Sequence, residues 1–406
     1  MNWDIIIMTN MNDIFFELIR LSIGTNNSLS HIPSETEWAA MYNMAKKQSL
    51  VGICFAGVQK LCDSDTQDYC GMSEIQYLTW MGMAAKIQQR NIRMNEYTAK
   101  ALAFFREKGF PCQVLKGQGI AKLYKVKNVK EGKERIESDL SLLRQSGDID
   151  VWLAGGREKI YKLSLDTFGE ITGANYHHIH FPIWKEPEIE AHIYPSYLSS
   201  PLRNKRLQDF CKQYEPLDDS DDTPSLAFNR VFILLHCYRH LSGHGVGMRQ
   251  LMDYYFVLKT LSDSPSPLLA SPPSPYCGQR LPKAGEEKEE TMKWVERLGM
   301  KRFAHATMWF MKEVFGLEDE YLICEPNEKD GLFLLSEVLQ TGNMGHSDER
   351  VDKSKLNSSL GRYIYNFKRD IHVMRICPHE ALWEPWFSLV LFIRRKFVWS
   401  RKWNVK

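Results

Sequence analysis

The feature that most constrains the fold of this chain is the run QSGDIDVWL at positions 145–153. Acidic and apolar side chains alternate in it, and such alternation places them on opposite faces of an extended strand. Asp148 and Asp150 therefore share one face, while the apolar residues enter a core. Their Cα atoms would lie about 6.6 Å apart, so that both carboxylates could hold a pair of divalent cations roughly 4 Å from each other. This arrangement is typical of metal-assisted phosphoryl or nucleotidyl transfer.

A lysine and a glycine follow the preceding apolar run. Lys116 and Gly117 come directly after residues 113–115. A helix that begins at Gly117 would point free N–H groups at an anion, and Lys116 would add a positive charge. Gly147, just before the acidic pair, would let the backbone approach a ligand closely.

A third carboxylate lies on a later predicted strand. Glu188, Glu190 and His192 alternate there with apolar residues, so the three polar side chains share a face. Glu190 is the candidate third acid, as a metal ligand or as a base toward the attacking hydroxyl. Two acids on a strand are often only solvated. It is the order of the three motifs along the chain that favours a catalytic site.

The spacing of apolar residues divides the chain into three regions. Residues 1–110 and 222–406 have the spacing of amphipathic helices, whereas residues 111–215 carry short apolar runs typical of strands. We therefore predict an α+β fold, with a small mixed sheet flanked by N-terminal helices and a C-terminal helical domain. A length of 406 residues agrees with two or three domains.

Local signals predict several of the elements. Ser34 and Glu37 form a capping box that starts a helix near Glu35, and residues 74–108 favour one or two helices that end at Gly109. The sheet region is expected to contain strands at 113–115, 149–153, 179–181 and 189–193, with helices at 117–124 and 156–168.

Two polar segments interrupt these elements. Residues 125–142 are rich in lysine and glutamate, and we expect a surface excursion that is partly helical. Residues 261–290 are dense in proline, serine and charged residues, which cannot build a core, so a flexible loop is expected there.

The composition argues against several classes of protein. The formal net charge is only +2, so the overall charge does not indicate a nucleic-acid or membrane partner. The 9 cysteines are scattered and never spaced as CxxC, which argues against a disulfide framework and a zinc ribbon. The N-terminus lacks the features of a secretory signal, and the apolar stretch at 386–393 is far shorter than the roughly 20 residues of a spanning helix. A cytoplasmic protein without a membrane partner is the expectation.

Histidines offer an alternative site. One group clusters in the strand region and a second recurs at i, i+4 spacing, which zinc ligands also use: His177, His178, His180 and His192, then His236, His240 and His244. No glutamate follows His236 as a zinc protease would require, so we favour histidines satisfied by hydrogen bonds in the core or at an interface. His240 and Arg249 are instead candidates to face the cleft from the helical half, and His192 is a further candidate cleft residue. Arg249 and Asp253 also have the spacing of an ordinary helix ion pair.

The C-terminal residues mix cations and aromatic rings. Arg394 to Lys396 are followed by Trp399, Arg401, Lys402 and Trp403, a composition that suits single-stranded nucleic acid. We prefer the simpler interpretation of an exposed amphipathic helix.

The motifs resemble the uncharacterised nucleotidyltransferase family of the DNA polymerase β-like superfamily. The resemblance rests on Leu115 to Gly117, on Arg144 to Asp150 and on Glu190 to His192, and it extends over residues 35–390. It implies that Asp148 and Asp150 bind Mg²⁺ (or Mn²⁺) and that Glu190 completes the triad. It also implies triphosphate contacts by a set of nearby residues: Lys116, Gly117, Arg144, Ser146 and Gly147.

Two departures from the superfamily pattern concern the phosphate contacts. Lys116 and Gly117 stand where the superfamily opens its helix with Gly-Ser, and the insertion at 125–142 lengthens the path from Lys116 to Asp148. The function that the resemblance implies is transfer of a nucleoside monophosphate from an NTP to an unknown hydroxyl or phosphate acceptor. An inactive relative that binds a nucleotide or a partner protein is the alternative, and a zinc hydrolase is a third.

Overall fold

The computed structural model describes residues 3–62, 68–130, 133–243, 245–261, 284–345, 348 and 359–394. Its N-terminal part consists of α1 (Trp3–Ile23), α2 (Glu35–Gln48), α3 (Val51–Leu61) and the long α4 (Glu74–Glu107). The capping box predicted at Ser34 is formed, and α2 begins at Glu35 as expected. Residues 74–107 form one helix, and Gly109 follows it with a φ of 77°.

A mixed sheet of 4 strands lies at the centre. Its strands are β1 (Cys112–Leu115), β4 (Ile149–Leu153), β5 (His178–His180) and β6 (Ile189–His192), in the order β1-β4-β6-β5. β4 runs parallel to β6 and antiparallel to β1, and β5 is antiparallel to β6. The short α5 (Gly117–Ala121) follows β1, and α6 (Gly156–Phe168) follows β4. The α+β fold is therefore confirmed, although β5 begins one residue earlier than predicted and α5 is shorter than the expected helix.

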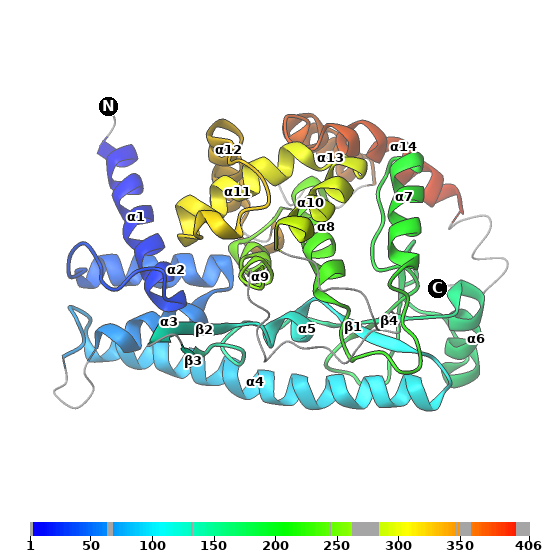
Figure 1. The fold of residues 1–406 in the computed structure, drawn as a ribbon, viewed down its shortest axis with the longest axis horizontal. Helices are drawn as coiled ribbons and strands as arrows, with labels where there is room; N and C mark the ends of the chain where they lie inside the picture. The colour runs from blue at the N-terminus through cyan, green and yellow to red at the C-terminus, as the bar shows by residue number, and fades with distance from the viewer. Residues whose placement is uncertain are drawn as a thin grey trace.

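The two faces of the sheet differ as the alternation predicts. Ile149, Val151 and Leu153 are buried in a core with residues of α4 and α6. The other face of β4 carries Asp150 and Trp152, and the Trp152 ring stacks on Phe228 of α8 (Leu226–Gly243) at 5.5 Å. α4 thus lies below the sheet and α8 above it (Figure 1). The polar face is turned toward the helical half of the chain.

Helices make up the rest of the described chain. They are α7 (Pro201–Lys212), α9 (Met248–Leu258), α10 (Ala284–Arg297), α11 (Lys301–Phe315), α12 (Glu328–Thr341), α13 (Ser359–Val373) and α14 (Pro378–Arg394), with short 3₁₀ turns at η2 (Asp319–Tyr321) and η3 (Asn343–Gly345). One continuous core joins α7 to α13 with α1, α2 and α3.

The segment at 125–142 differs from its prediction. It forms an antiparallel hairpin of β2 (Lys125–Lys130) and β3 (Lys133–Asp139), not a partly helical excursion. Cross-strand pairing satisfies the backbone groups that a helix would have satisfied locally. Val126 is 4% exposed and belongs to the main core, so the start of the hairpin is anchored.

The prediction of a flexible loop at 261–290 is wrong for its last residues, which are helical. Residues 284–290 belong to α10, whose charged residues are good helix formers. Residues 262–283 lie outside the described residues, as do His244 and the C-terminal residues 395–406 with their aromatic and basic side chains.

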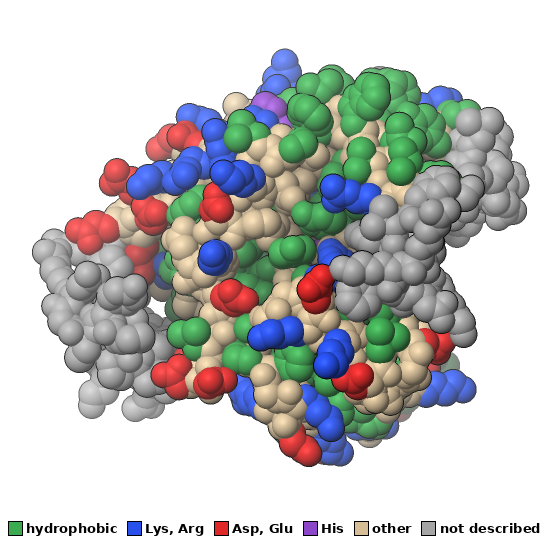
Figure 2. Space-filling view, turned by 90° about the vertical axis from the view of Figure 1, so that its right-hand side faces the viewer, with side chains coloured by type: hydrophobic (Ala, Val, Ile, Leu, Met, Phe, Trp, Pro, Cys, Tyr) green, Lys and Arg blue, Asp and Glu red, His purple; other side chains and the backbone are tan. Residues whose placement is uncertain are grey.

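Exposed apolar side chains gather on α13 and α14. Figure 2 shows hydrophobic side chains clustered at the top of one face, where these helices lie. They include Phe367 and Ile371 on α13, and Leu382, Trp386 and Phe392 on α14. None of the helices in the described ranges is both long and apolar enough to cross a membrane. The 8 cysteines within those ranges are free thiols.

Candidate functional site

Asp150 and Glu190 face each other across neighbouring strands. They are register partners in the parallel pair of β4 and β6, so their side chains leave the same face of the sheet. Asp148 precedes β4 by one residue, and its carboxylate acts electrostatically on Asp150 and on Lys116. The three acids that were predicted to converge therefore lie in one region.

Two cations contact the Asp150 carboxylate. Asp150 is 2% exposed, and its Oδ1 lies 3.0 Å from Lys116 Nζ and 2.8 Å from His192 Nε2. Burial and the nearby Asp148 raise the pKa of Asp150, and the two cations offset part of this rise. Burial lowers the pKa of His192, but its hydrogen bonds to Asp150 and Glu190 outweigh this effect and raise it to about 9.

Two histidines contact the Glu190 carboxylate. Its Oε2 lies 3.0 Å from His178 Nδ1 and 3.3 Å from His192 Nε2. Burial raises the pKa of Glu190, but these two rings outweigh it and hold the pKa well below its usual range. Glu188, by contrast, lies outside β6 and contacts His180 at 2.5 Å, so it is not part of the group around Asp150.

Asn175 fixes the tautomer of the neutral His178 ring. Asn175 Oδ1 accepts hydrogen bonds from the backbone N–H groups of His177 and His178, at 3.0 and 2.9 Å. Its amide NH₂ therefore faces His178 Nε2, at 2.5 Å, and that nitrogen must accept. The ring proton then resides on Nδ1, the atom beside Glu190. His178 Nδ1 thus faces the Glu190 carboxylate at 3.0 Å.

Lys116 has a strained backbone. Its φ is 35° and its ψ is −151°, a region that residues with a Cβ rarely adopt and that costs about 1–3 kcal/mol. The following helix α5 contains only 5 residues, too few to build up an appreciable helix dipole. The helix does begin at Gly117, but the anion contact predicted there stays a prediction, and the Lys116 ammonium contacts Asp150 at 3.0 Å.

Arg144 has a partner that its sequence position did not indicate. Its Nε and Nη2 each donate to Asp253, at 2.6 Å, and Tyr124 Oη donates to the same carboxylate at 2.7 Å. Arg144 is 5% exposed and Asp253 2%. This buried pair joins the loop before β4 to α9, and it occupies the guanidinium that was expected to meet a triphosphate.

Arg249 takes the position nearer the acids. Its Nη1 donates to the Gln145 carbonyl at 3.0 Å, and its buried Nε has no hydrogen-bond partner among the described residues. Burial and the nearby Arg144 lower its pKa to about 10, whereas Asp253 and Asp148 act in the opposite direction. Within the described part of the chain, Arg249 forms no ion pair with Asp253, so the predicted helix pair is not made.

The loop between Arg144 and β4 contains a buried hydroxyl group without a hydrogen-bond partner among the described residues. Ser146 is 7% exposed, and its Oγ has no hydrogen-bond partner in the part of the chain that the structure describes. A Cβ added at Gly147 would meet Arg249 Nη1 at an ordinary contact distance of 3.9 Å, so the protein itself does not require glycine there. Ser146 Oγ and Arg249 Nε are thus two buried donors that a bound anion would satisfy.

His236 and His240 face each other on α8. Their Nε2 atoms are 3.1 Å apart. Neither histidine belongs to a group of potential metal ligands among the described residues. Burial lowers the pKa of His236 well below its usual value, and His240 and Lys116 lower it further. These two residues fit the prediction of histidines satisfied by hydrogen bonds.

This shift predicts a pH dependence of stability. An unfolded chain protonates His236 below about pH 6.5, whereas the folded chain keeps it neutral, so stability is lost as the pH falls. Between pH 7 and 5.5 the wild type should lose about 1 kcal/mol more unfolding free energy than His236→Gln. Urea titrations at both pH values measure this, with His305→Gln, on the exposed side of α11, as the control. Equal losses in wild type and His236→Gln would contradict it.

Three groups of side chains within the described residues could hold a metal ion. They are Asp150 with Glu190 and His192, His178 with His180 and Glu190, and His177 with His178 and His192. In each group the potential ligand atoms lie within 4.8 Å of one another. Ser146 Oγ and Arg249 Nε, on the loop before β4 and on α9, are buried polar atoms without a hydrogen-bond partner among the described residues.

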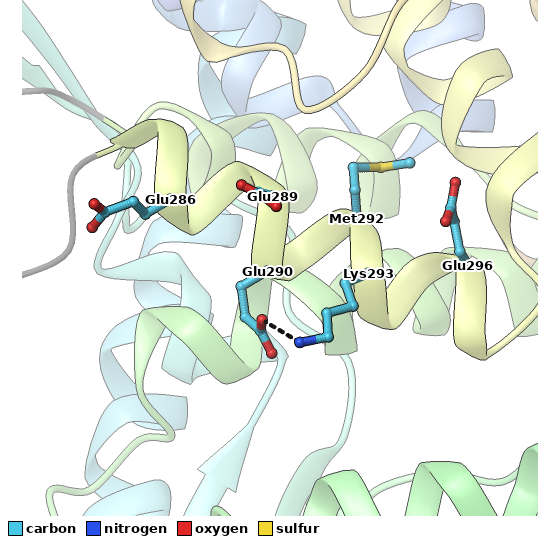
Figure 3. A pocket seen from close by; sticks show the side chains of 6 residues that line it. All are labelled: Glu286, Glu289, Glu290, Met292, Lys293 and Glu296. Carbon is cyan, nitrogen blue, oxygen red and sulfur yellow. Dashed lines mark hydrogen bonds and ion pairs between the residues drawn. The ribbon is translucent and has the colours of Figure 1, made fainter.

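A surface hollow along α10 is separate from this region. Figure 3 shows its lining, which includes Glu286, Glu289 and Glu296, with Lys293 Nζ 3.4 Å from Glu290 Oε2. All its lining residues lie on one helix, and none belongs to the sheet. It therefore adds nothing to the site around Asp150.

The comparisons with known proteins agree with this geometry. The profile described as uncharacterised nucleotidyltransferase matches residues 34–266, which is more than half of the chain. The match includes β1, β4, β6 and α9, and with them all the residues described around Asp150. No curated protein and no solved structure matches the chain.

Proposed function

Because the chain belongs to the uncharacterised nucleotidyltransferase family, we propose that it is a divalent-metal-dependent nucleotidyltransferase. It would move a nucleoside monophosphate from an NTP to a hydroxyl or phosphate acceptor and release pyrophosphate. The observation that carries this proposal is the pairing of Asp150 with Glu190 on parallel strands, next to Asp148. The fold, with helical parts on both sides of the sheet, leaves the polar face of β4 turned toward α8.

Asp148, Asp150 and Glu190 would hold Mg²⁺ or Mn²⁺, because carboxylate oxygens are the ligands these ions prefer. When bound, the metal would neutralise charge on the α-phosphate and on the leaving pyrophosphate. Lys116 and His178 position two of these carboxylates through contacts of 3.0 Å each. Glu190, on the neighbouring strand, would orient or deprotonate the acceptor.

The polyphosphate would lie against Arg249 and Ser146. Both present a buried donor that no group in the described ranges satisfies, and a planar guanidinium suits phosphate oxygens. Lys116, whose side chain is 20% exposed, adds positive charge on the sheet side. His240 lies on α8 next to His236 and remains a candidate contact on the helical side.

Label transfer tests the proposal. The purified chain is incubated with α-³²P-labelled NTPs, Mg²⁺ or Mn²⁺, and pools of proteins, RNAs, sugars and phosphorylated metabolites. Transfer of label with one pyrophosphate released per label supports the proposal. Metal-dependent NTP binding without transfer to any pool supports the alternative, a relative that binds nucleotides without turnover.

A second measurement locates the polyphosphate. Arg249→Gln should weaken NTP binding about tenfold, which corresponds to the loss of one charge-assisted contact. The affinity for the nucleoside monophosphate should change much less, because the Arg249 contact is expected beyond the α-phosphate. Isothermal titration with both nucleotides gives the ratio, and Arg93→Gln, an exposed arginine of α4, is the control. Equal weakening for NTP and monophosphate would place Arg249 elsewhere.

A further inference from the structure

One of the three potential metal groups combines oxygen and nitrogen donors at the centre of the site. His192 is 2% exposed, and its Nε2 lies 2.8 Å from Asp150 Oδ1 and 3.3 Å from Glu190 Oε2. The three donor atoms can all lie within 4.8 Å of one another. The imidazole therefore occupies the gap between two carboxylates of the acidic triad.

Each of these three side chains also has an outer partner. His192 Nδ1 lies 3.3 Å from the Tyr194 carbonyl, so Nδ1 donates there and Nε2 is the nitrogen turned toward the acids. Asp150 contacts Lys116, and Glu190 contacts His178, at 3.0 Å each. Outer partners of this kind, a backbone carbonyl for histidine above all, fix the ring and the tautomer of metal-ligating residues.

In the other two groups, one ring cannot give up the proton on its ligand nitrogen and keep its outer hydrogen bond, as His192 can by retaining the proton on Nδ1. Both contain His178. Its Nε2 accepts from Asn175, which leaves the proton on Nδ1, and Asn175 cannot be turned over because its oxygen accepts two backbone N–H groups. A metal would have to break this arrangement to bind His178.

We propose that His192 is a nitrogen ligand of the catalytic metal site and makes it prefer Mn²⁺, Co²⁺ or Zn²⁺ to Mg²⁺. The inference rests on the proposed function, in which Asp150 and Glu190 hold the metal. Imidazole binds transition-metal ions well, whereas Mg²⁺ favours oxygen ligands in strict octahedral geometry. A site in which one imidazole joins the carboxylates is therefore selective where carboxylates alone would not be.

Electron spin-echo spectroscopy of the full chain loaded with Mn²⁺ tests this directly. The wild type should show modulation from a directly coordinated ¹⁴N nucleus, and His192→Gln should lose it. In equilibrium dialysis with the metals alone, His192→Gln should weaken Mn²⁺ binding about 10–100-fold and change Mg²⁺ binding less than about threefold. His180→Gln, which changes the ring that contacts Glu188, is the matched control and should retain both properties.

Two outcomes overturn the inference. One is Mn²⁺ bound to the wild type without nitrogen coupling, and the other is a His192→Gln variant that keeps both the coupling and the metal preference. If His192→Gln does not fold, by circular dichroism, then ¹⁵N-histidine labelling of His178→Gln decides, because both rival groups contain His178 and the coupling must survive its replacement and still change with the isotope. A protein that binds Mn²⁺ without nitrogen coupling but still needs metal to bind NTP retains the proposed function and loses only the role of His192.

Discussion

Asp150→Asn should reduce nucleotide transfer by about 10²–10³-fold, the range seen when a charge-stabilising group is removed from an active site. The change keeps the size of the side chain and removes the negative charge that two cations and a metal would share. Asp150 Oδ1 is within 3.0 Å of both Lys116 and His192, so no nearby carboxylate oxygen can take over both contacts. Metal-dependent NTP binding, measured by titration of Mg²⁺ or Mn²⁺ at fixed NTP, should be lost as well.

Asp148→Asn separates this catalytic effect from a loss of folding. Asp148 makes no hydrogen bond or ion pair within the described residues, unlike the buried Asp150, so its replacement should leave the unfolding free energy nearly unchanged. Asp166→Asn, on the exposed side of α6, is the control for a surface charge. Equal metal-dependent NTP binding by the wild type, Asp148→Asn and Asp150→Asn would exclude the acidic pair from the site.

The acidic face of the sheet could be predicted from the sequence for a local reason. Alternation with a period of two residues decides which side chains of a strand are buried, and Ile149 and Val151 are 1% and 0% exposed. Asp150 is then forced onto the other face. The same rule predicted the face of β6 from which Glu190 projects. The register of the parallel pair then brings Glu190 opposite Asp150.

Long-range pairings could not be predicted in this way. Arg144 and Asp253 are 109 positions apart, and no spacing rule connects them, whereas the i, i+4 rule suggested a pair of Arg249 with Asp253 that is not formed. The contact between Asn175 and His178 is local. Its relevance to the site depends on Glu190, which lies beside His178 only in the folded chain. The hairpin at 125–139 was missed because its lysines and glutamates suit a helix as well as an exposed strand pair.

The pair of Arg144 and Asp253 predicts the largest effect on stability. Asp253→Ala would leave a guanidinium that is 5% exposed without its carboxylate, and it would also remove the acceptor of Tyr124 Oη. Breaking a buried pair in this way costs about 3–5 kcal/mol of unfolding free energy. Urea unfolding measures the loss. Glu318→Ala, which breaks the more exposed pair with Lys259, should cost less than about 1 kcal/mol.

The double variant Arg144→Met/Asp253→Leu separates structure from function at the same pair. Apolar residues of similar size often replace a buried ion pair at little cost, so this variant should recover most of the stability that Asp253→Ala loses. If Arg144 serves only to join the loop before β4 to α9, then the folded double variant should bind NTP as the wild type does. If Arg144 contacts the triphosphate, as its place in the sequence motif implied, then NTP affinity should fall at least tenfold while stability is regained. The geometry of the pair, in which Asp253 takes both Nε and Nη2, favours the first result.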